Sequence, residues 1–322
     1  MIDKIARILR EEDRFVVVTH VNPDGDAIGC LLGLSLALSE MGKKSWPLAS
    51  RKVPDLYGFL PGIDRVATDI SEIPERPSWI ISVDAAEARR ISGNINAWRD
   101  KAKLINIDHH ATNPEFGDIN YIDPSATSTA ELVYQILKEA GYRLSPGVGK
   151  CLYTGIITDT GGFRFAGVNS RTLQIGSEIL ASGFDSYDVA MPLFEEMPIT
   201  RFHLERLVLD RMEVLLDGKL IISTLYREDF IALGADKSES ENLVDRLREI
   251  RGAEAGVLIT ANFDDLTRVS LRSKHNIDVA EIAGAFGGGG HKRAAGIRTD
   301  IPVDELKKKL EAAIGAALND GR

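Results

Sequence analysis

The stretch "THVNPDGDAIGC", residues 19–30, places His20, Asp24 and Asp26 within seven positions of a turn broken by Gly and Pro. An imidazole nitrogen together with carboxylate oxygens is the ligand mixture that suits borderline to hard divalent cations such as Mn²⁺. The same residue types also make surface turns for local reasons, so this motif by itself leaves a plain turn open. A metal site requires partner residues elsewhere in the chain.

Three more polar clusters follow apolar or helical segments. Asp84 follows "WIISV", the run Asp108, His109 and His110 follows "LINI", and Asp159 ends "VGKCLYTGIITD". Taken one at a time, Asp84 could cap a helix, the histidine pair could lie in an exposed turn, and Asp159 could be a loop residue.

The clusters taken together favour a metal centre. Five carboxylates at one edge of a sheet would repel one another without cations between them. A pair of divalent ions about 3.5–4 Å apart resolves this and forms the usual clamp for displacement at phosphorus.

The elements that position these residues alternate along the first half of the chain. Short β-rich runs, "FVVVTH", "SWIISVD" and "AKLINID", alternate with helical patterns such as "AIGCLLGLSLALSEMG". This alternation predicts an α/β fold with a parallel sheet, in which ligands bind at the carboxyl ends of the strands. The polar clusters stand at those ends.

The domain organisation is predicted from where this pattern stops. We expect a catalytic metal-binding domain over residues 1–190 and a helical linker over 191–215, from the helix-like "ITRFHLERLVLDRMEVLLDGK". A smaller α/β substrate-binding domain is expected over 216–322, with the active site in the cleft between the two domains.

The composition predicts a cytoplasmic globular protein. The chain has 322 residues, 44% of them hydrophobic, and no apolar run approaches the roughly 20 residues that span a bilayer. The N-terminus lacks the apolar centre of a signal peptide, so no membrane is expected as a partner. Cys30 and Cys151 lie in apolar helix-like sequence, where buried thiols are expected rather than a disulfide.

The charge distribution limits the kind of substrate. A net charge of −9 argues against a sequence-blind grip on long nucleic acid, including long duplexes. Residues 268–298 depart from the trend, with six Lys or Arg against two acidic residues, and form a candidate anion-binding segment.

The stretch "GGGGHKRAAG", residues 287–296, is the second candidate site. Backbone amides without side chains can approach a phosphate closely, and His291 with nearby cations could complete an anion site. A flexible hinge is the alternative. A dinucleotide-binding fingerprint is disfavoured because "VAEIAGAF", which reads as helix, precedes the glycines where a strand would be required.

At this point the chain resembles a known family. "THVNPDGDAIG", "SVDAAE", "INIDHH" and "GIITDTGGF", in this order, resemble the four motifs of the DHH phosphoesterase superfamily. The resemblance implies two Mn²⁺ ions, with Mg²⁺ or Co²⁺ as other ions that the site could use. The implied ligands are His20, Asp24 and Asp84 for one ion, and Asp26, Asp84, His109 and Asp159 for the other. It also implies that His110 faces the scissile phosphate and that Asp108 orients a neighbouring histidine.

The C-terminal segment is similar to the domain that accompanies the DHH domain in one branch of the superfamily. The segment that carries this likeness is "VSLRSKHNIDVAEIAGAFGGGGHKRAAG". The likeness implies that this domain holds the distal phosphate or sugar of a short nucleotide. The implied binding residues are Arg272, Ser273, Gly287, Gly288, Gly289, Gly290 and His291.

Within the superfamily, the chain most resembles the stand-alone nanoRNase and pAp phosphatase group. The resemblance implies hydrolysis of single-stranded oligonucleotides of about two to five units to mononucleotides, and a distal grip would impose such a size limit. It also implies removal of the 3′-phosphate from 3′-phosphoadenosine 5′-phosphate (pAp). A hydrolase of cyclic di-AMP or linear pApA is the main alternative, exopolyphosphatase is a weaker one, and a non-catalytic nucleotide sensor represents a different class. A homodimer is left open.

Overall fold

Five parallel strands form the sheet of the N-terminal unit, in the order β2-β1-β3-β4-β5. The strands are β1 (Arg14–Val18), β2 (Lys44–Leu48), β3 (Trp79–Val83), β4 (Lys103–Asp108) and β5 (Ile119–Ile122). Alternate side chains enter two cores: Val17 and Ile81 pack on one face, and Val16 and Ile80 pack on the other. The α/β class and the parallel sheet predicted from the alternating pattern are confirmed.

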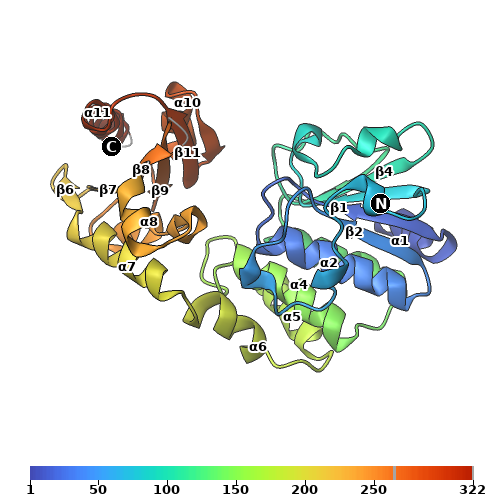
Figure 1. Ribbon diagram of the computed structural model, residues 1–322. Coiled ribbons are helices and arrows are strands. Elements are labelled where there is room, and N and C mark those ends of the chain that lie inside the picture. The colour runs from blue at the N-terminus through green and yellow to red at the C-terminus, as the bar shows by residue number, and fades with distance from the viewer. Residues whose placement is uncertain (264–265, 321–322) are drawn as a thin grey trace. The chain divides into compact units, whose positions relative to one another are not determined.

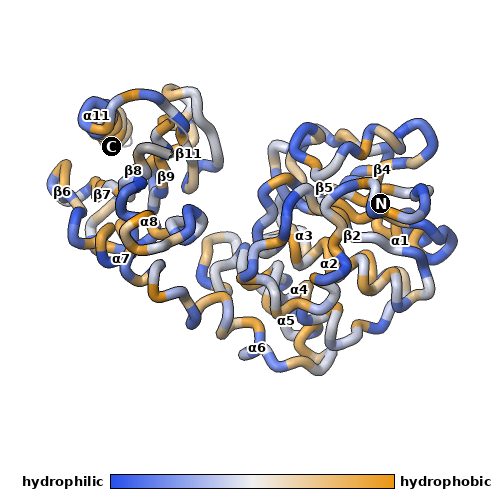
Figure 2. The backbone as a smooth tube through the Cα atoms, viewed as in Figure 1, coloured by the Kyte–Doolittle hydropathy of each residue, from blue (hydrophilic) through white to orange (hydrophobic). Residues whose placement is uncertain are grey.

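This computed structural model describes residues 1–263 and 266–320. The chain divides into two units, Met1–Glu196 and Met197–Arg322, each with its own hydrophobic core. Figure 2 shows the apolar residues of the N-terminal unit concentrated in its central strands and in the helices beside them. In the described ranges, no helix combines the length and apolarity that crossing a membrane requires.

Six α-helices belong to the N-terminal unit, which Figure 1 shows beside its sheet. They are α1 (Ile2–Glu11), α2 (Gly25–Glu40), α3 (Thr129–Glu139), α4 (Pro146–Asp159), α5 (Ser170–Leu180) and α6 (Tyr187–Ala190). Helices α2 and α4 pack closely: a Cβ added to Gly29 would lie 2.9 Å from the backbone nitrogen of Gly155. This contact brings the start of α2, which carries Asp26, beside the end of α4, which carries Asp159.

The C-terminal unit has a six-stranded mixed sheet in the order β10-β11-β9-β8-β7-β6. Its strands are β6 (Glu213–Leu215), β7 (Leu220–Tyr226), β8 (Ala255–Phe263), β9 (Leu266–Ser273), β10 (Gly289–His291) and β11 (Ala294–Thr299). Its helices are α7 (Ile199–Asp210), α8 (Arg227–Leu233), α9 (Val244–Glu249), α10 (Val279–Ala285) and α11 (Val303–Asp320).

The single long helix expected from residue 199 to 219 is wrong. Helix α7 ends at Asp210, and β6 then pairs antiparallel with β7. Leu216, Asp217 and Gly218 all have positive φ values, of 52°, 53° and 80°. An Asp-Gly pair in this conformation is a strong hairpin signal, and it overrides the helical spacing of the preceding leucines.

Candidate metal centre

The histidines and carboxylates predicted as metal ligands come together at the carboxyl edge of the N-terminal sheet. Their ligand atoms form three groups, each with all atoms within 4.8 Å of one another. The groups are His20, Asp24 and Asp84; Asp26, His109 and Asp159; and Asp84, His109 and His110. The first group is the same as the first predicted ligand set. The second group contains every residue of the second predicted set except Asp84.

Asp84 belongs to two of these three groups. Its carboxylate oxygens lie 3.7 Å from Nε2 of His20 and 3.7 Å from Nε2 of His109. The residue follows β3 with a φ of +55°, a left-handed conformation that Asp and Asn adopt more readily than other residues with side chains. Such strain is held in place by surrounding structure and occurs often at functional sites. Asp84 therefore contacts a histidine from each of the two predicted ligand sets, and the short helix that follows is capped at Glu87 and not at Asp84.

Asp26, in the first turn of α2, is fully buried, and its side chain reaches the N-terminus of α3. Its carboxylate accepts hydrogen bonds from the backbone N–H groups of Thr129, at 2.6 Å, and Ala130, at 3.0 Å. The Cys30 thiol lies 3.5 Å from the same carboxylate. An anion is favoured at a helix N-terminus, so α3 holds this side chain in one orientation while lone pairs remain for a cation.

Helix α2 begins at the other aspartate of the first motif. Asp24 is the N-cap of α2, and its Oδ1 accepts a hydrogen bond from the backbone N–H of Ala27 at 3.1 Å. The chain bends at Val21 and Asn22, and Gly25 is already the first residue of α2, so the stretch starts the helix with both aspartates at the sheet edge. The surface-turn and metal-site interpretations are compatible here.

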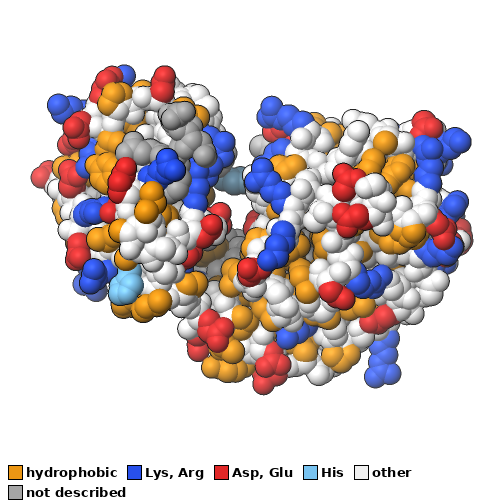
Figure 3. All heavy atoms as spheres, viewed as in Figure 1, with side chains coloured by type: hydrophobic (Ala, Val, Ile, Leu, Met, Phe, Trp, Pro, Cys, Tyr) orange, Lys and Arg blue, Asp and Glu red, His pale blue; other side chains and the backbone are white. Residues whose placement is uncertain are grey.

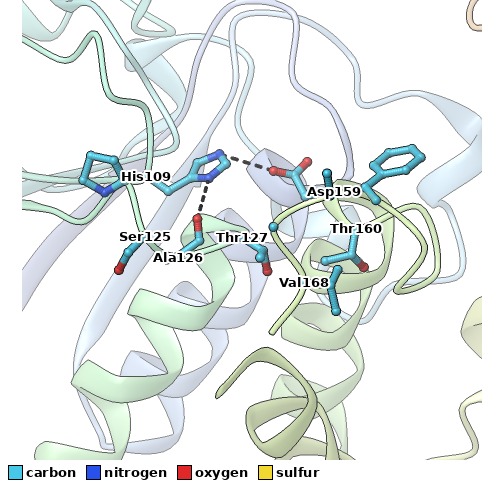
Figure 4. A pocket seen from close by; sticks show the side chains of 11 residues that line it. His109, Ser125, Ala126, Thr127, Asp159, Thr160 and Val168 are labelled. Atoms are coloured by element: carbon cyan, nitrogen blue, oxygen red, sulfur yellow. Dashed lines mark hydrogen bonds and ion pairs between the residues drawn. The ribbon is translucent and has the colours of Figure 1, made fainter. Parts of the chain in front are cut away.

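His109 has the orientation expected of a metal ligand. Its Nδ1 lies 3.4 Å from the carbonyl oxygen of Ala126, and its Nε2 lies 3.3 Å from Oδ2 of Asp159 (Figure 4). A proton on Nδ1, donated to the carbonyl, leaves the Nε2 lone pair facing Asp159. Metal-bound histidines commonly have this arrangement, with the second nitrogen donating to a backbone carbonyl.

The electrostatics of the centre favour bound cations. Burial, reinforced by the negative charges of neighbouring aspartates, raises the pKa of Asp26 and of Asp159 well above the ordinary range. Burial also raises the pKa of Asp84, but the contact with His20 and the nearby histidine rings outweigh it and hold that pKa at about 2. Divalent cations among these oxygens would remove the mutual repulsion, so the donor set fits the implied metals.

His110 is oriented by Asp108, the last residue of β4. Nδ1 of His110 lies 2.7 Å from Oδ1 of the buried Asp108. Burial lowers the pKa of His110, but this hydrogen bond and the surrounding carboxylates outweigh it and raise the pKa to about 9. The same Nδ1 atom lies 3.7 Å from Oδ1 of Asp84, so Asp108 holds the His110 ring beside the metal-ligand cluster.

Two supporting residues were missed in the sequence. The Asn113 side chain donates to Oδ2 of Asp108 at 2.6 Å and to the carbonyl of Ala85 at 3.1 Å, so it ties β4 to the segment after Asp84. The Thr129 hydroxyl donates to Oδ1 of Asp84 at 3.0 Å. Asn113 follows the histidine pair within "DHHATN", which is the only local signal; Thr129 reaches Asp84 through tertiary packing alone.

In the C-terminal unit, the predicted substrate residues separate into two faces of one sheet. Arg272 and His291 occupy one row across β9, β11 and β10, on either side of Ala294. Side chains alternate along a strand, so Ser273 points to the opposite face from Arg272. Ser273 is fully buried and donates to the Lys292 carbonyl at 3.2 Å, so it supports the hairpin rather than facing a ligand.

The glycine run is more ordered than a loop. Gly289 and Gly290 belong to strand β10, whereas Gly287 and Gly288 precede it. A Cβ on Gly290, which has a φ of 150°, would lie 2.5 Å from the carbonyl oxygen of Ala294. The glycine is thus required by the close approach of β10 to β11, and this strand pairing argues against the flexible-hinge alternative.

Comparison with known proteins matches each unit to the model of a known domain. The model of the DHH family, N-terminal domain, matches residues 14–156, and that of the DHHA1 domain matches residues 217–317. The bifunctional oligoribonuclease and PAP phosphatase NrnA of Thermus thermophilus is 32% identical over 96% of this chain and 92% of that protein. The Bacillus subtilis protein of the same name is 29% identical over 91% of each chain.

Other relatives match nearly the whole length of this chain. The cyclic-di-AMP phosphodiesterase PdeA of Listeria monocytogenes is 27% identical, and the match covers 97% of this chain but 49% of PdeA. The crystal structure of an exopolyphosphatase-related protein from Bacteroides fragilis superposes with a TM-score of 0.91 at 28% identity, covering 98% of this chain and 95% of that one. Given the two family models and the identity along nearly its full length, this chain belongs to the DHH family of phosphoesterases.

Proposed function

We propose that this chain is a Mn²⁺-dependent hydrolase that cuts oligonucleotides of about two to five units to nucleoside monophosphates and removes the 3′-phosphate of pAp. The observation that carries the proposal is the convergence of histidine and carboxylate ligand atoms around Asp84 at one sheet edge. The names of the Thermus and Bacillus relatives support the substrate class.

The ligand residues have separate roles in this proposal. His20, Asp24 and Asp84 would hold one ion, and Asp26, Asp84, His109 and Asp159 would hold the other. Bound divalent ions supply a polarised phosphoryl group and an activated water. The mixture of imidazole and carboxylate is chemically suited to Mn²⁺, and Mg²⁺ or Co²⁺ would be the comparison ions.

His110 acts on the reacting phosphate in this scheme. Asp108 holds the His110 ring through Nδ1, and Asn113 in turn donates to Asp108, so the imidazole is positioned beside the carboxylate cluster before the reaction. A hydrogen-bond donor that is already oriented toward the phosphate can stabilise negative charge in the transition state without a cost of reorganisation. Its expected contribution is to kcat rather than to metal binding.

Surface charge agrees with small substrates. On the face shown in Figure 3, Lys and Arg side chains are interspersed with Asp and Glu, and the whole chain carries a net charge of −9. Long nucleic acids bind through continuous basic surfaces. In the C-terminal unit, we propose that Arg272 and His291, together with the backbone at Gly287 and Gly288, hold the distal phosphate or sugar.

The test is a side-by-side assay with Mn²⁺ on four substrates: a 5′-phosphorylated RNA dinucleotide, pAp, cyclic di-AMP and polyphosphate. The unaltered chain and an Asp84→Asn variant are assayed in parallel. Release of mononucleotide from the dinucleotide and of phosphate from pAp, lost in the variant, is the expected result. Hydrolysis of cyclic di-AMP alone would contradict the substrate assignment and favour the activity for which PdeA is named.

A further inference from the structure

The backbone carbonyl of Ala126 is the group that orients the ring of His109. Nδ1 of His109 lies 3.4 Å from this oxygen, and Figure 4 shows the ring between the carbonyl and Asp159. A carbonyl oxygen belongs to the backbone, so the side chain at position 126 cannot hold it in place. Its position depends on how the segment 123–128, which joins β5 to α3, is fixed.

The residues on either side of Ala126 are each fixed by a carboxylate. The backbone N–H and the hydroxyl of Ser125 donate to Oδ1 of Asp123, at 3.0 and 2.5 Å. The backbone N–H of Thr127 donates to Oε1 of Glu131 at 3.2 Å, and its hydroxyl donates to the same oxygen. The Ala126 carbonyl is therefore placed by two carboxylates, one on each side of it in the chain.

Arg171, in the first turn of α5, pairs with both of these carboxylates. Its two terminal nitrogens each donate to Oδ2 of Asp123 at 3.1 Å. Its Nε lies 3.7 Å from Oε2 of Glu131. One guanidinium thus joins the two groups that fix the segment before α3, and a planar group with several donors is suited to such a shared contact.

The charges of this network make the guanidinium important. Glu131 is fully buried, and its Oε2 makes no hydrogen bond to the part of the chain that the structure describes. Burial raises the pKa of Asp123, but the hydrogen bonds from Ser125 and Arg171 outweigh it and lower that pKa. Removing the cation would leave two carboxylates without their shared partner, and leaving a buried charge unpaired is strongly unfavourable.

The same stretch of chain continues into contacts with two more predicted metal ligands. At the start of α3, the backbone N–H groups of Thr129 and Ala130 donate to Asp26. The Thr129 hydroxyl donates to Asp84. A displacement of the segment 123–128 would therefore reach Asp26 and Asp84 as well as His109.

We propose that Arg171 is a positioning residue for the metal centre. Through Asp123 and Glu131 it fixes the Ala126 carbonyl, and that carbonyl holds His109 with Nε2 toward Asp159. The proposal rests on the proposed function, because it requires divalent ions in the two ligand sets, but it does not depend on which phosphate ester is hydrolysed. His109 and Asp26 belong to the same predicted ligand set, so the ion of that set should depend most on Arg171.

The test compares Arg171→Met with a matched control, Arg99→Met, in the full-length chain. Arg99 also pairs with a carboxylate of the N-terminal unit, that of Asp118 at 2.7 Å, and the exposed fractions of the two arginine side chains are similar, 29% for Arg99 and 37% for Arg171. Asp118 accepts from the backbone of Leu104, near the start of β4 and away from the carboxyl edge of the sheet. Each variant loses one arginine–carboxylate contact, but only one contact supports the segment before α3.

Two further variants keep the test decisive if Arg171→Met folds poorly. Asp123→Asn keeps an oxygen to accept from Ser125 but replaces the acceptor of Arg171 with an amide NH₂ group, which cannot accept. Arg171→Lys keeps the positive charge but has one nitrogen in place of the three that contact the two carboxylates. It should therefore restore part of what Arg171→Met loses.

The readout is a calorimetric titration of the metal-free chain with Mn²⁺ alone, which gives the number of ions bound and the Kd of each. Thermal unfolding of every variant is measured in parallel. In Arg171→Met, one Kd should rise by about 10–100-fold, as is typical when a residue behind a metal ligand is removed. Asp123→Asn should weaken the same ion, Arg171→Lys should lie between Arg171→Met and the unaltered chain, and Arg99→Met should leave both Kd values unchanged.

Two results would overturn the proposal. One is unchanged Kd values in both Arg171→Met and Asp123→Asn. The other is equal weakening in Arg171→Met and Arg99→Met, which would show a general effect of lost stability. Absence of Mn²⁺ binding by the unaltered chain would instead refute the metal assignment of the proposed function, so the two failures are distinguishable.

Discussion

Asp26 and Gly155 face each other across the contact between α2 and α4 so closely that a Cβ on Gly155 would lie 2.6 Å from Oδ1 of Asp26. The same Cβ would lie 2.8 Å from Cβ of Ala130, at the start of α3. The absence of a side chain at position 155 is therefore what allows three helices to meet around a buried carboxylate.

Gly155→Ala should reduce both stability and metal binding. The added methyl group meets a buried carboxylate and backbone that cannot move freely, and such overpacking costs typically about 1–3 kcal/mol. Denaturant unfolding and metal analysis of the purified variant measure the two effects. Gly284→Ala, in α10 with nothing within 4 Å of the added Cβ, is the control and should be neutral or slightly stabilising. Normal metal content in Gly155→Ala would contradict the role assigned to Asp26.

Asp84→Asn should abolish activity and lower bound metal, because one residue is proposed to contact both ions. Asn tolerates the left-handed backbone at this position, so the fold should be kept. We expect activity to fall by more than about 100-fold, since changes even to residues behind metal ligands cost about 10–100-fold. Elemental analysis after dialysis against Mn²⁺ is the measurement, with the exposed Asp55→Asn as control. Full metal occupancy in Asp84→Asn would rule out the bridging role.

His110→Ala should lower kcat while leaving metal content near that of the unaltered chain. Nδ1 of His110 is hydrogen-bonded to Asp108, and the residue is assigned to the substrate phosphate. A positioned donor or proton-transfer group contributes about 10²–10⁴-fold to rate. Steady-state kinetics and metal analysis on the same preparation separate a role in the chemical step from a role in metal binding. Metal loss in His110→Ala would instead support the third ligand group, in which His110 joins Asp84 and His109.

Arg272→Ala and Ser273→Ala should behave differently, although the residues are neighbours. The Arg272 variant loses a charged donor for a substrate anion, and KM for a dinucleotide should rise by about 10-fold or more, as hydrogen bonds to charged groups contribute about 1.5–3 kcal/mol. The Ser273 variant loses a buried hydrogen bond to the Lys292 carbonyl, so unfolding free energy should fall while KM changes little. Equal increases in KM for both variants would count against the two-face arrangement.

The ion pair between Arg211 and Asp229 should stabilise the C-terminal unit in a pH-dependent way. Two Arg211 nitrogens lie 2.5 and 2.9 Å from the two Asp229 oxygens, and the hydrogen bond from Arg211 lowers the pKa of Asp229. A carboxylate whose folded-state pKa is depressed contributes stability above its unfolded-state pKa, and the contribution is lost as pH falls through the folded-state pKa.

Arg211→Met should therefore lower the unfolding free energy by about 1 kcal/mol at pH 7. The difference from the unaltered chain should shrink as pH falls below about 4, the unfolded-state pKa of Asp. Urea unfolding between pH 7 and pH 3 measures this difference in unfolding free energy. The control is Arg251→Met, at an exposed position. A difference that stays constant down to pH 3 would show that Arg211 acts through packing alone.

The sequence by itself determined the class of the N-terminal fold and the residues that gather at its edge. Alternating apolar runs specify parallel strands because side-chain period and element length are local properties, and parallel strands place the residues that follow them at a common edge. The N-terminal sheet and the grouping of His20, Asp84 and His109 agree with that reasoning.

Tertiary structure alone decided the contacts that hold those residues in place. The hydrogen bond from Thr129 to Asp84 and the space that Gly155 leaves for Asp26 join segments far apart in the chain, and nothing in the local spacing of one segment encodes the other. Tertiary pairing also overrode local patterns at the end of α7 and in the glycine run, where strand pairing required a hairpin at Gly218 and close backbone approach at Gly290. Local periodicity predicts which face of an element is apolar, whereas the partner that covers it is selected by packing of the whole unit.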